Sequence, residues 1–170
     1  HSSRTFRDHF KRGEELIDFD EACIEIRAQH DRFVEIVGRE PDYFEAHAVM
    51  SKNLNRAISA VAQELGLKEQ KASFDPAAVV HCGDTDLRMV MRSMEPGYEP
   101  KEAIMQTVRG MVDGETVVFV CHPGYLDRFI LENSSLTTDR TKEVDALIDP
   151  ELRAWLESQS DLRLIDYRDL

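Results

Sequence analysis

An apolar side chain at every third or fourth position is the first clear pattern along the chain, and it is the spacing of an α-helix with one buried face. Residues 18–38, DFDEACIEIRAQHDRFVEIVG, follow this spacing, with Asp20 as the expected N-cap and Gly38 as the expected C-cap. Residues 53–67, NLNRAISAVAQELGL, follow it again and close at Gly66. We predict an amphipathic helix in each of these segments.

Short apolar runs, which are typical of buried strands, separate the helical segments. Strands are predicted at residues 43–46, in AAVVHCG at 77–83, in ETVVFVC at 115–121 and, with a turn, in LRLIDYRDL at 162–170. Further helices are predicted at residues 100–112, 138–149 and 150–159. Prolines and a glycine punctuate residues 68–100, which we interpret as a long excursion on one face of a domain.

The alternation of strands with helices predicts an α/β fold with a parallel sheet, because parallel strands are usually joined by helical crossovers. The 170 residues are enough for one domain or for a substantial part of a larger one. We therefore interpret residues 1–170 as a single α/β domain.

Composition narrows the possible partners and the cellular location. The 33 acidic residues outnumber the 21 basic residues, which gives a net charge of −12. This charge is repelled by nucleic acids and by anionic membranes, so neither is expected as a partner. The three cysteines lack CxxC spacing and favour a reducing compartment. No apolar run reaches membrane-spanning length, and the cysteine usage leads us to expect a cytoplasmic protein.

Histidines stand at the ends of two predicted strands. DYFEAH ends at His47 and TVVFVCH ends at His122, and the C-terminal ends of parallel strands meet at one face of a sheet. Pro123 and Gly124 fix a tight turn after the second histidine. Glu45 lies on the same side of an extended strand as His47, where it either orients a neighbouring group or is a rim carboxylate. The two histidines are candidate site residues, and a structural role for each stays open.

Other kinds of site find no support in the sequence. The GxGxxG, Walker and GxSxG motifs are absent, so nucleotide binding and serine hydrolase chemistry are not indicated. His81 and Cys82 are adjacent, but no second ligand pair has the spacing of a zinc site. Cys121 adjoins His122, but neighbours on a strand point to opposite faces. The cysteines are therefore expected to be buried small apolar residues.

Three stretches of the chain contain a distinctive series of motifs: IRAQHDRFVEIVGREPDYFEAH, VCHPGYLD and SSLTTDRTKEVDALIDPELRAWLESQSDLRLIDYRDL. Together they resemble the YdjC-like carbohydrate deacetylases. Members of this family show a helix with Gln and Phe, then G-x-x-P, a strand ending in D-S-H, and later a strand ending in C-H-P-G. The order and approximate spacing of these elements agree over nearly the whole chain.

The resemblance implies an irregular (β/α) barrel that removes acetyl groups from N-acetylated sugars with one divalent metal ion, Mg²⁺ or Zn²⁺. His47 matches the first histidine of the family motif D-S-H-H-H, which implies a metal ligand. His122 matches the histidine of C-H-P-G, which implies a general acid or a group that binds the acyl oxygen. The candidate substrate-binding residues are Glu45, Gly124, Tyr125 and Arg140. A packing role stays open for the last two.

The sequence departs from the family pattern in two places. After His47 the further histidines of the family are replaced by Ala48, Val49, Met50 and Ser51. The D-D motif and the early H-x-N element, which supply the base and the other metal ligands of the family, are missing, and Asp84 and Asp86 do not match D-D in position. Because such a barrel takes about 200 residues or more, we expect an incomplete barrel, its C-terminal two-thirds, that is inactive unless another chain completes the site.

Two alternatives to sugar deacetylation stay open. One is a different reaction on the same scaffold, since one fold serves many chemistries. The other is a degenerate, non-catalytic homologue that binds carbohydrate or a protein partner. In either case, the open strand edges of an incomplete barrel favour a homodimer.

Overall fold

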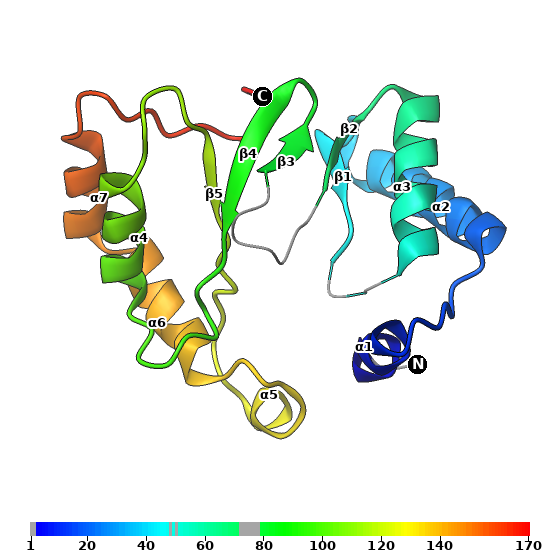
Figure 1. The fold of residues 1–170 in the computed structure, drawn as a ribbon, viewed down its shortest axis with the longest axis horizontal. Helices are drawn as coiled ribbons and strands as arrows, with labels where there is room; N and C mark the ends of the chain where they lie inside the picture. Colours follow the sequence, from blue (N-terminus) through cyan, green and yellow to red (C-terminus); the bar gives the residue numbers. More distant parts are fainter. Residues whose placement is uncertain (1–2, 48, 50, 72–78) are drawn as a thin grey trace. The chain divides into compact units, whose positions relative to one another are not determined.

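The computed structural model describes residues 3–47, 49, 51–71 and 79–170, which divide into two compact units (Figure 1). The first unit comprises His1–Ser73, Val80–Asp86 and Asp166–Leu170, and the second comprises Phe74–Val79 and Leu87–Ile165. The division into compact units does not test whether residues 1–170 form a single domain, so the single domain stays a prediction. Within the described ranges, no helix is long and apolar enough to cross a membrane.

The first unit contains three helices, two of them packed together, and three short strands. Its elements are α1 (Ser3–Lys11), α2 (Phe19–Val37), β1 (Tyr43–Glu45), α3 (Lys52–Leu65), β2 (Lys68–Gln70) and most of β3 (Val79–Cys82). β1 runs parallel to β2, with Glu45 opposite Gln70, and β2 runs antiparallel to β3. The helices predicted at 18–38 and 53–67 and the strand predicted at 43–46 are confirmed. The strand predicted at 77–83 is confirmed over β3, and its first two residues lie outside the described ones.

The second unit pairs two parallel strands with four helices. β4 (Thr85–Val90) begins in the first unit and continues into the second, where Arg88 lies opposite Val117 of β5 (Val117–Phe119). The helices are α4 (Pro100–Arg109), α5 (Arg128–Asn133), α6 (Thr138–Leu147) and α7 (Pro150–Glu157). Hydrogen-bonded strand neighbours follow chain order from β1 to β5. The strand predicted at 115–121 and the helices predicted after residue 100 are confirmed.

The prediction of an all-parallel sheet is wrong at β3. This strand is antiparallel to β2, which makes the fold mixed α/β with a five-stranded sheet. A parallel connection takes about a dozen residues or more, and only residues 71–78 join β2 to β3. β3 and β4 are joined by Gly83 and Asp84, and the left-handed φ of 58° at Gly83 suits a tight hairpin turn. A complete barrel is not confirmed.

The predicted strand at 162–170 is also wrong, although the turn is present near Tyr167. Residues 162–166 have no regular structure, and Leu164 is 58% exposed. Side-chain contacts hold the end of this segment in the first unit. The ring of Tyr167 stacks on Tyr43 with centroids 3.9 Å apart, and the Lys68 Nζ donates a hydrogen bond to the Tyr167 carbonyl at 3.3 Å.

The ends of α2 show why the chain enters and leaves this helix where it does. The N-cap is Asp18 and not the predicted Asp20, because the Asp18 carboxylate accepts hydrogen bonds from the backbone N–H groups of Asp20 and Glu21 at 2.9 and 3.0 Å. Asp20 is instead a first-turn acidic residue, favourable beside the positive end of the helix dipole. Gly38 is the predicted C-cap, with the left-handed φ of 75° that glycine adopts readily.

The core of the first unit fixes which face of β1 is available to a site. Its buried members, on α2 and α3, are Ala22, Cys23, Ala57 and Val61. Phe44, in the middle of β1, packs against them. Because side chains alternate across a strand, Tyr43 and Glu45 lie on the opposite face of β1 from this core. The carboxylate of Glu45 and the chain that continues to His47 are thereby kept away from the helices.

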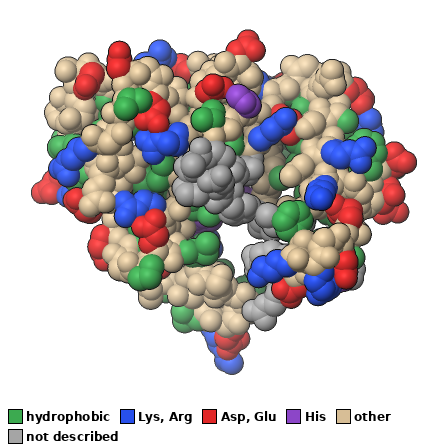
Figure 2. Space-filling model, viewed as in Figure 1, with side chains coloured by type: hydrophobic (Ala, Val, Ile, Leu, Met, Phe, Trp, Pro, Cys, Tyr) green, Lys and Arg blue, Asp and Glu red, His purple; other side chains and the backbone are tan. Residues whose placement is uncertain are grey.

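The surface carries charges of both signs. Figure 2 shows Asp and Glu side chains interspersed with Lys and Arg side chains over the face in view. One pair links α2 to α3, where the Arg27 Nη2 lies 2.5 Å from the Glu64 Oε2. Both side chains are about half exposed, so the pair contributes little to stability. The net charge of −12 is consistent with a well-solvated surface.

His30, on α2, makes stability depend on pH. Its Nε2 lies 2.6 Å from the Glu40 carboxylate and its Nδ1 lies 3.1 Å from the Asp31 carboxylate, and these contacts, Glu40 first, raise the pKa of His30. A raised folded-state pKa stabilises the fold fully below the unfolded pKa of about 6.5, and this stabilisation is lost as pH rises through the folded value. We expect His30→Gln to lower the urea midpoint more at pH 5.5 than at pH 8.5.

Glu40→Gln serves as the partner control for this measurement. It removes the main carboxylate that His30 faces, so it is expected to reproduce most of the same pH dependence. An equal loss of stability at both pH values for His30→Gln would contradict the ion-pair explanation.

Candidate active site

Glu45 and His47 form the first cluster of predicted site residues. Glu45 is the last residue of β1, and the Nδ1 of His47 lies 3.8 Å from its Oε1. The His47 side chain is 76% exposed and the Glu45 side chain 42% exposed. This distance is too long for a hydrogen bond, so the imidazole and the carboxylate lie close together without bonding to each other, and both remain able to bind a third group.

Gln70 is a residue of this cluster that the sequence did not indicate. It lies opposite Glu45 in the parallel pair of β1 and β2, and only 5% of it is exposed. Within the described part of the chain, its buried amide oxygen has no hydrogen-bond partner. The Gln70 side chain hydrogen-bonds Tyr167, and its buried oxygen has almost no accessible surface, so Gln70 is a structural neighbour of the cluster and not a contact for a bound molecule. The short sequence KEQ carries no apolar alternation that could have revealed the strand.

The described residues supply only some of the ligands that a divalent metal ion needs. An imidazole and a carboxylate are suitable ligands for Zn²⁺ or another divalent ion, but catalytic zinc sites have three protein ligands. Among the described residues, no group of three or more His, Cys, Asp or Glu side chains is placed to hold a metal ion. Ala48 and Met50, where the family has further histidines, and His1 lie outside the described residues. The residues present therefore do not complete a metal centre.

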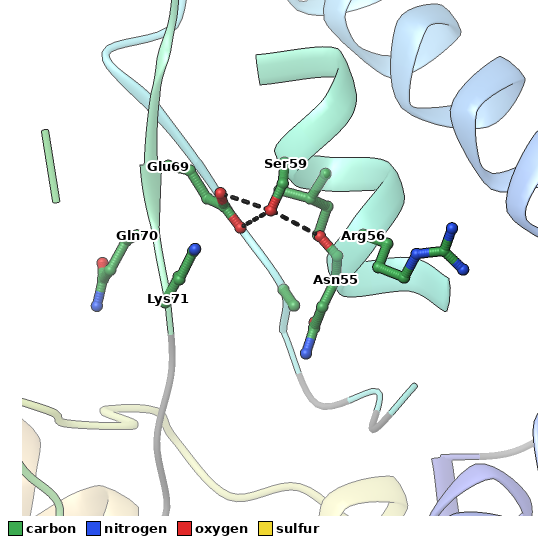
Figure 3. A pocket seen from close by; sticks show the side chains of 8 residues that line it. Asn55, Arg56, Ser59, Glu69, Gln70 and Lys71 are labelled. Atoms are coloured by element: carbon green, nitrogen blue, oxygen red, sulfur yellow. Dashed lines mark hydrogen bonds between the residues drawn. The ribbon is translucent and has the colours of Figure 1, made fainter. Parts of the chain in front are cut away.

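A polar pocket of about 260 Å³ lies between α3 and β2 (Figure 3). Glu69 points from β2 toward α3, where its carboxylate oxygens lie 2.8 and 2.7 Å from the Ser59 hydroxyl, whereas Gln70 points away (Figure 3). Arg56 and Lys71 add positive charge to the lining. Because Glu69 is already engaged by Ser59 and no predicted site residue lines the pocket, it is not the site indicated by the sequence.

His122, in the second unit, forms the second cluster. The chain leaves β5 with the Val120 N–H donating to the Val90 carbonyl at 2.8 Å, and His122 follows two residues later. The His122 backbone N–H donates to the Glu143 carboxylate at 2.6 Å, and its Nδ1 lies 3.4 Å from the Ser93 hydroxyl. The backbone and one ring nitrogen are thus both occupied, which leaves Nε2 as the ring atom available to a substrate.

Gly124 and Arg140 are brought together by the turn after His122. The Gly124 N–H donates to the Arg140 carbonyl at 3.2 Å. A Cβ on Gly124 would lie 2.9 Å from the Arg140 Nε, which is buried and has no hydrogen-bond partner in the described part of the chain. Because Gly124 has no side chain, the Arg140 guanidinium is able to occupy the space beside it. The predicted substrate-binding roles of these two residues stay predictions, and Tyr125 is 81% exposed.

Replacing Gly124 with alanine is expected to reduce the free energy of unfolding by about 1–3 kcal/mol, because the new methyl group overpacks against the buried Arg140 Nε. Gly110→Ala is the matched control. A Cβ there would lie 3.4 Å from the Gln106 carbonyl oxygen at an ordinary φ of −93°, so its effect should stay within about 0.5 kcal/mol. Urea denaturation of both variants measures the difference. Equal stabilities would show that Arg140 moves aside freely.

Buried polar groups surround the turn and were not indicated by the sequence. Glu143, Ser93 and Tyr98 are all at least 95% buried. Burial, with the charge of Glu143, raises the pKa of the Cys121 thiol to about 11. This keeps Cys121 protonated at neutral pH, which agrees with the prediction that it is not a nucleophile. The predicted burial is confirmed for Cys23 and Cys82, whereas Cys121 is only partly buried.

Comparison with known proteins first defines the fold. The chain resembles a crystal structure from Enterococcus faecalis V583, described as a candidate cellobiose-phosphate cleavage protein, with a TM-score of 0.68 and 21% identity over 90% of this chain and 61% of that one. The chain therefore has the same mixed α/β fold as the matching part of that structure. The family model described as YdjC-like protein matches residues 2–158, and the chain belongs to this family.

Two curated relatives carry names that state an activity. "Carbohydrate deacetylase 2" of Listeria innocua serovar 6a is 27% identical over 154 residues, which cover 89% of this chain and 60% of that protein. "Chitooligosaccharide deacetylase" of Klebsiella pneumoniae subsp. pneumoniae is 28% identical over 167 residues, which cover 92% of this chain and 64% of that protein. The chain thus spans slightly more than half of the length of these relatives.

Proposed function

We propose that this protein is a carbohydrate deacetylase that hydrolyses the linear amide of an N-acetylated sugar, with chitooligosaccharides as the substrate class. The names of its relatives support this activity. The observation that carries the proposal is the position of His122, which stands at the end of β5 with its backbone held by Glu143 and its Nδ1 beside Ser93. Catalytic groups need this kind of fixed placement.

The reaction we propose for this site is attack of water on the acetyl carbon, followed by loss of the sugar amine. A carboxylate base, which is not assigned among the described residues, takes a proton from the attacking water, and the His122 imidazole donates a proton to the departing nitrogen, so the carbon–nitrogen bond breaks to give a free amine and acetate. The guanidinium of Arg140, which lies beside Gly124, is the proposed donor of a hydrogen bond to an oxygen of the substrate. Glu45, Gly124 and Tyr125 remain proposed contacts to the sugar.

The proposal includes one divalent metal ion, Mg²⁺ or Zn²⁺, with His47 as one ligand. When bound, such an ion would supply Lewis-acid activation of the amide carbonyl and of water, with His47 as the residue that would hold it. Because the described residues offer only His47 with Glu45 beside it, the remaining ligands and the base are not assigned. We also propose a cytoplasmic homodimer without nucleic-acid or membrane partners, supported by the net charge of −12 and by exposed apolar side chains such as Phe129, 68% exposed.

Acetate release tests the proposal. The complete gene product is purified and incubated with an N-acetylated chitooligosaccharide, with Mg²⁺ or Zn²⁺ added and with a chelator in a parallel sample, and acetate and free amine are measured. Equal amounts of both products, dependent on the ion, would support a metal-dependent deacetylase. A folded protein that binds the oligosaccharide without releasing acetate would overturn the hydrolase and support the non-catalytic binding protein.

A further inference from the structure

Glu143, on α6, is a fully buried carboxylate that is directed at the turn carrying His122. We propose that Glu143 is a positioning residue, which fixes the backbone of this turn and thereby the direction of the His122 imidazole. The inference rests on the proposed catalytic role of His122 and adds to it the group that sets its geometry.

Both oxygens of the Glu143 carboxylate are used. The Oε2 accepts the His122 backbone N–H at 2.6 Å, and the Oε1 accepts the Tyr98 hydroxyl at 3.0 Å. Tyr98 is itself only 4% exposed. Burial, followed by the hydrogen bond to Glu143, raises the pKa of Tyr98, so its hydroxyl remains a donor at all ordinary pH values. The carboxylate therefore joins the turn after β5 to Tyr98, which lies two residues before α4.

The cost of this arrangement argues for a purpose beyond packing. Burying a carboxylate is expensive, and apolar side chains of similar volume often stabilise a core as well or better. Among the described residues, no Lys or Arg side chain forms an ion pair with Glu143, so neutral donors alone satisfy it. The closer of these donors is the backbone of the proposed catalytic residue.

Two further contacts restrain the same turn. One helical turn before Glu143 on α6, the Arg140 carbonyl accepts the Gly124 N–H at 3.2 Å. The Ser93 hydroxyl, 1% exposed, lies 3.4 Å from the His122 Nδ1. The backbone is thus held at His122 and Gly124 while the ring is held at Nδ1. A displacement of a reacting group by about 1 Å can lower a rate by about 100-fold, so releasing the first of these restraints should be measurable.

Glu143→Gln tests the proposal, with Tyr98→Phe as the matched control. The glutamine keeps the volume of the side chain but loses the charge at the His122 N–H, whereas Tyr98→Phe removes the other hydrogen bond on the same carboxylate. For acetate release we expect Glu143→Gln to lower kcat about 10- to 100-fold with little change in KM, and Tyr98→Phe to change kcat less than threefold. Equal losses in the two variants, or none in either, would overturn the positioning role.

Nuclear magnetic resonance separates this proposal from the proposed enzyme activity. In the unaltered protein the His122 amide proton should resonate far downfield and exchange slowly with solvent, because it is bonded to a buried carboxylate. In Glu143→Gln that resonance should shift upfield and the His122 ring signals should broaden or move. The readout in the unaltered protein holds even if no acetate is released, or if the variant does not fold. Rapid exchange of the His122 amide in the unaltered protein would overturn the inference.

Discussion

Replacing His122 with glutamine is expected to lower kcat for acetate release by about 100- to 10,000-fold, the range over which a general acid contributes to a reaction. Glutamine is uncharged and carries no proton that it can transfer at neutral pH, although its amide can still reach toward Ser93. The backbone hydrogen bond to Glu143 involves no side-chain atom of residue 122, so the turn should keep its conformation. The measurement is steady-state hydrolysis of an N-acetylated chitooligosaccharide.

His81→Gln provides the control for a histidine substitution. His81 lies on β3, its side chain is 65% exposed, and its Nδ1 lies 2.5 Å from Asp86. Its replacement should leave kcat within about twofold of the unaltered value, as expected for a surface position. If His122→Gln instead kept kcat and raised only KM, His122 would bind the acetyl oxygen or the sugar and would not supply the proton.

Leu87→Ala is expected to reduce the free energy of unfolding by about 2–5 kcal/mol. Leu87 lies on β4 and is completely buried, with 0% of its surface exposed. Truncation removes three carbon atoms from the core and leaves a cavity. Because β4 is held by its hydrogen bonds to β5, it cannot move far enough to close this cavity fully. Urea denaturation followed by circular dichroism measures the change.

The same substitution at Leu164 separates burial from the loss of leucine itself. Leu164 is 58% exposed, so Leu164→Ala should change the free energy of unfolding by no more than about 0.5 kcal/mol. Similar losses in the two variants would contradict the core position of Leu87. A loss well below about 2 kcal/mol in Leu87→Ala would show that the residues around the middle of β4 repack into the space.

The sequence predicted those elements whose stability is local. The helix at α2 was predicted from its apolar spacing, yet its N-cap lies two residues earlier than expected, because two aspartates flank Phe19 and only Asp18 reaches the free N–H groups. The short strand β2 and the helix α5 were not predicted. β2 has a polar sequence whose pairing with β1 depends on partners distant in the chain, and none of the residues of α5 is buried.

The sequence predicted only those site residues that follow predicted strands or that match the family motifs. His47 and His122 could be found because apolar runs stop at them, and Gly124 and Arg140, which the structure brings together, came from the family resemblance. Glu143 could not be found, because a glutamate on a helix is normally exposed and only the packing of α6 shows it to be buried. Whether the two histidines act on one substrate stays a prediction, since they belong to different units.

The composition of the first unit bears on how the protein is made by the ribosome. That unit takes Asp166–Leu170 from beyond the second unit, and Tyr167 is stacked there on Tyr43. A ribosome adds about 5–20 residues per second, so the 80 positions from Asp86 to Asp166 (166 − 86) take roughly 4–16 seconds to synthesise. During that interval Tyr43 and Lys68 lack their contacts with Tyr167. The first unit can complete these contacts only after the ribosome has synthesised the whole of the second unit.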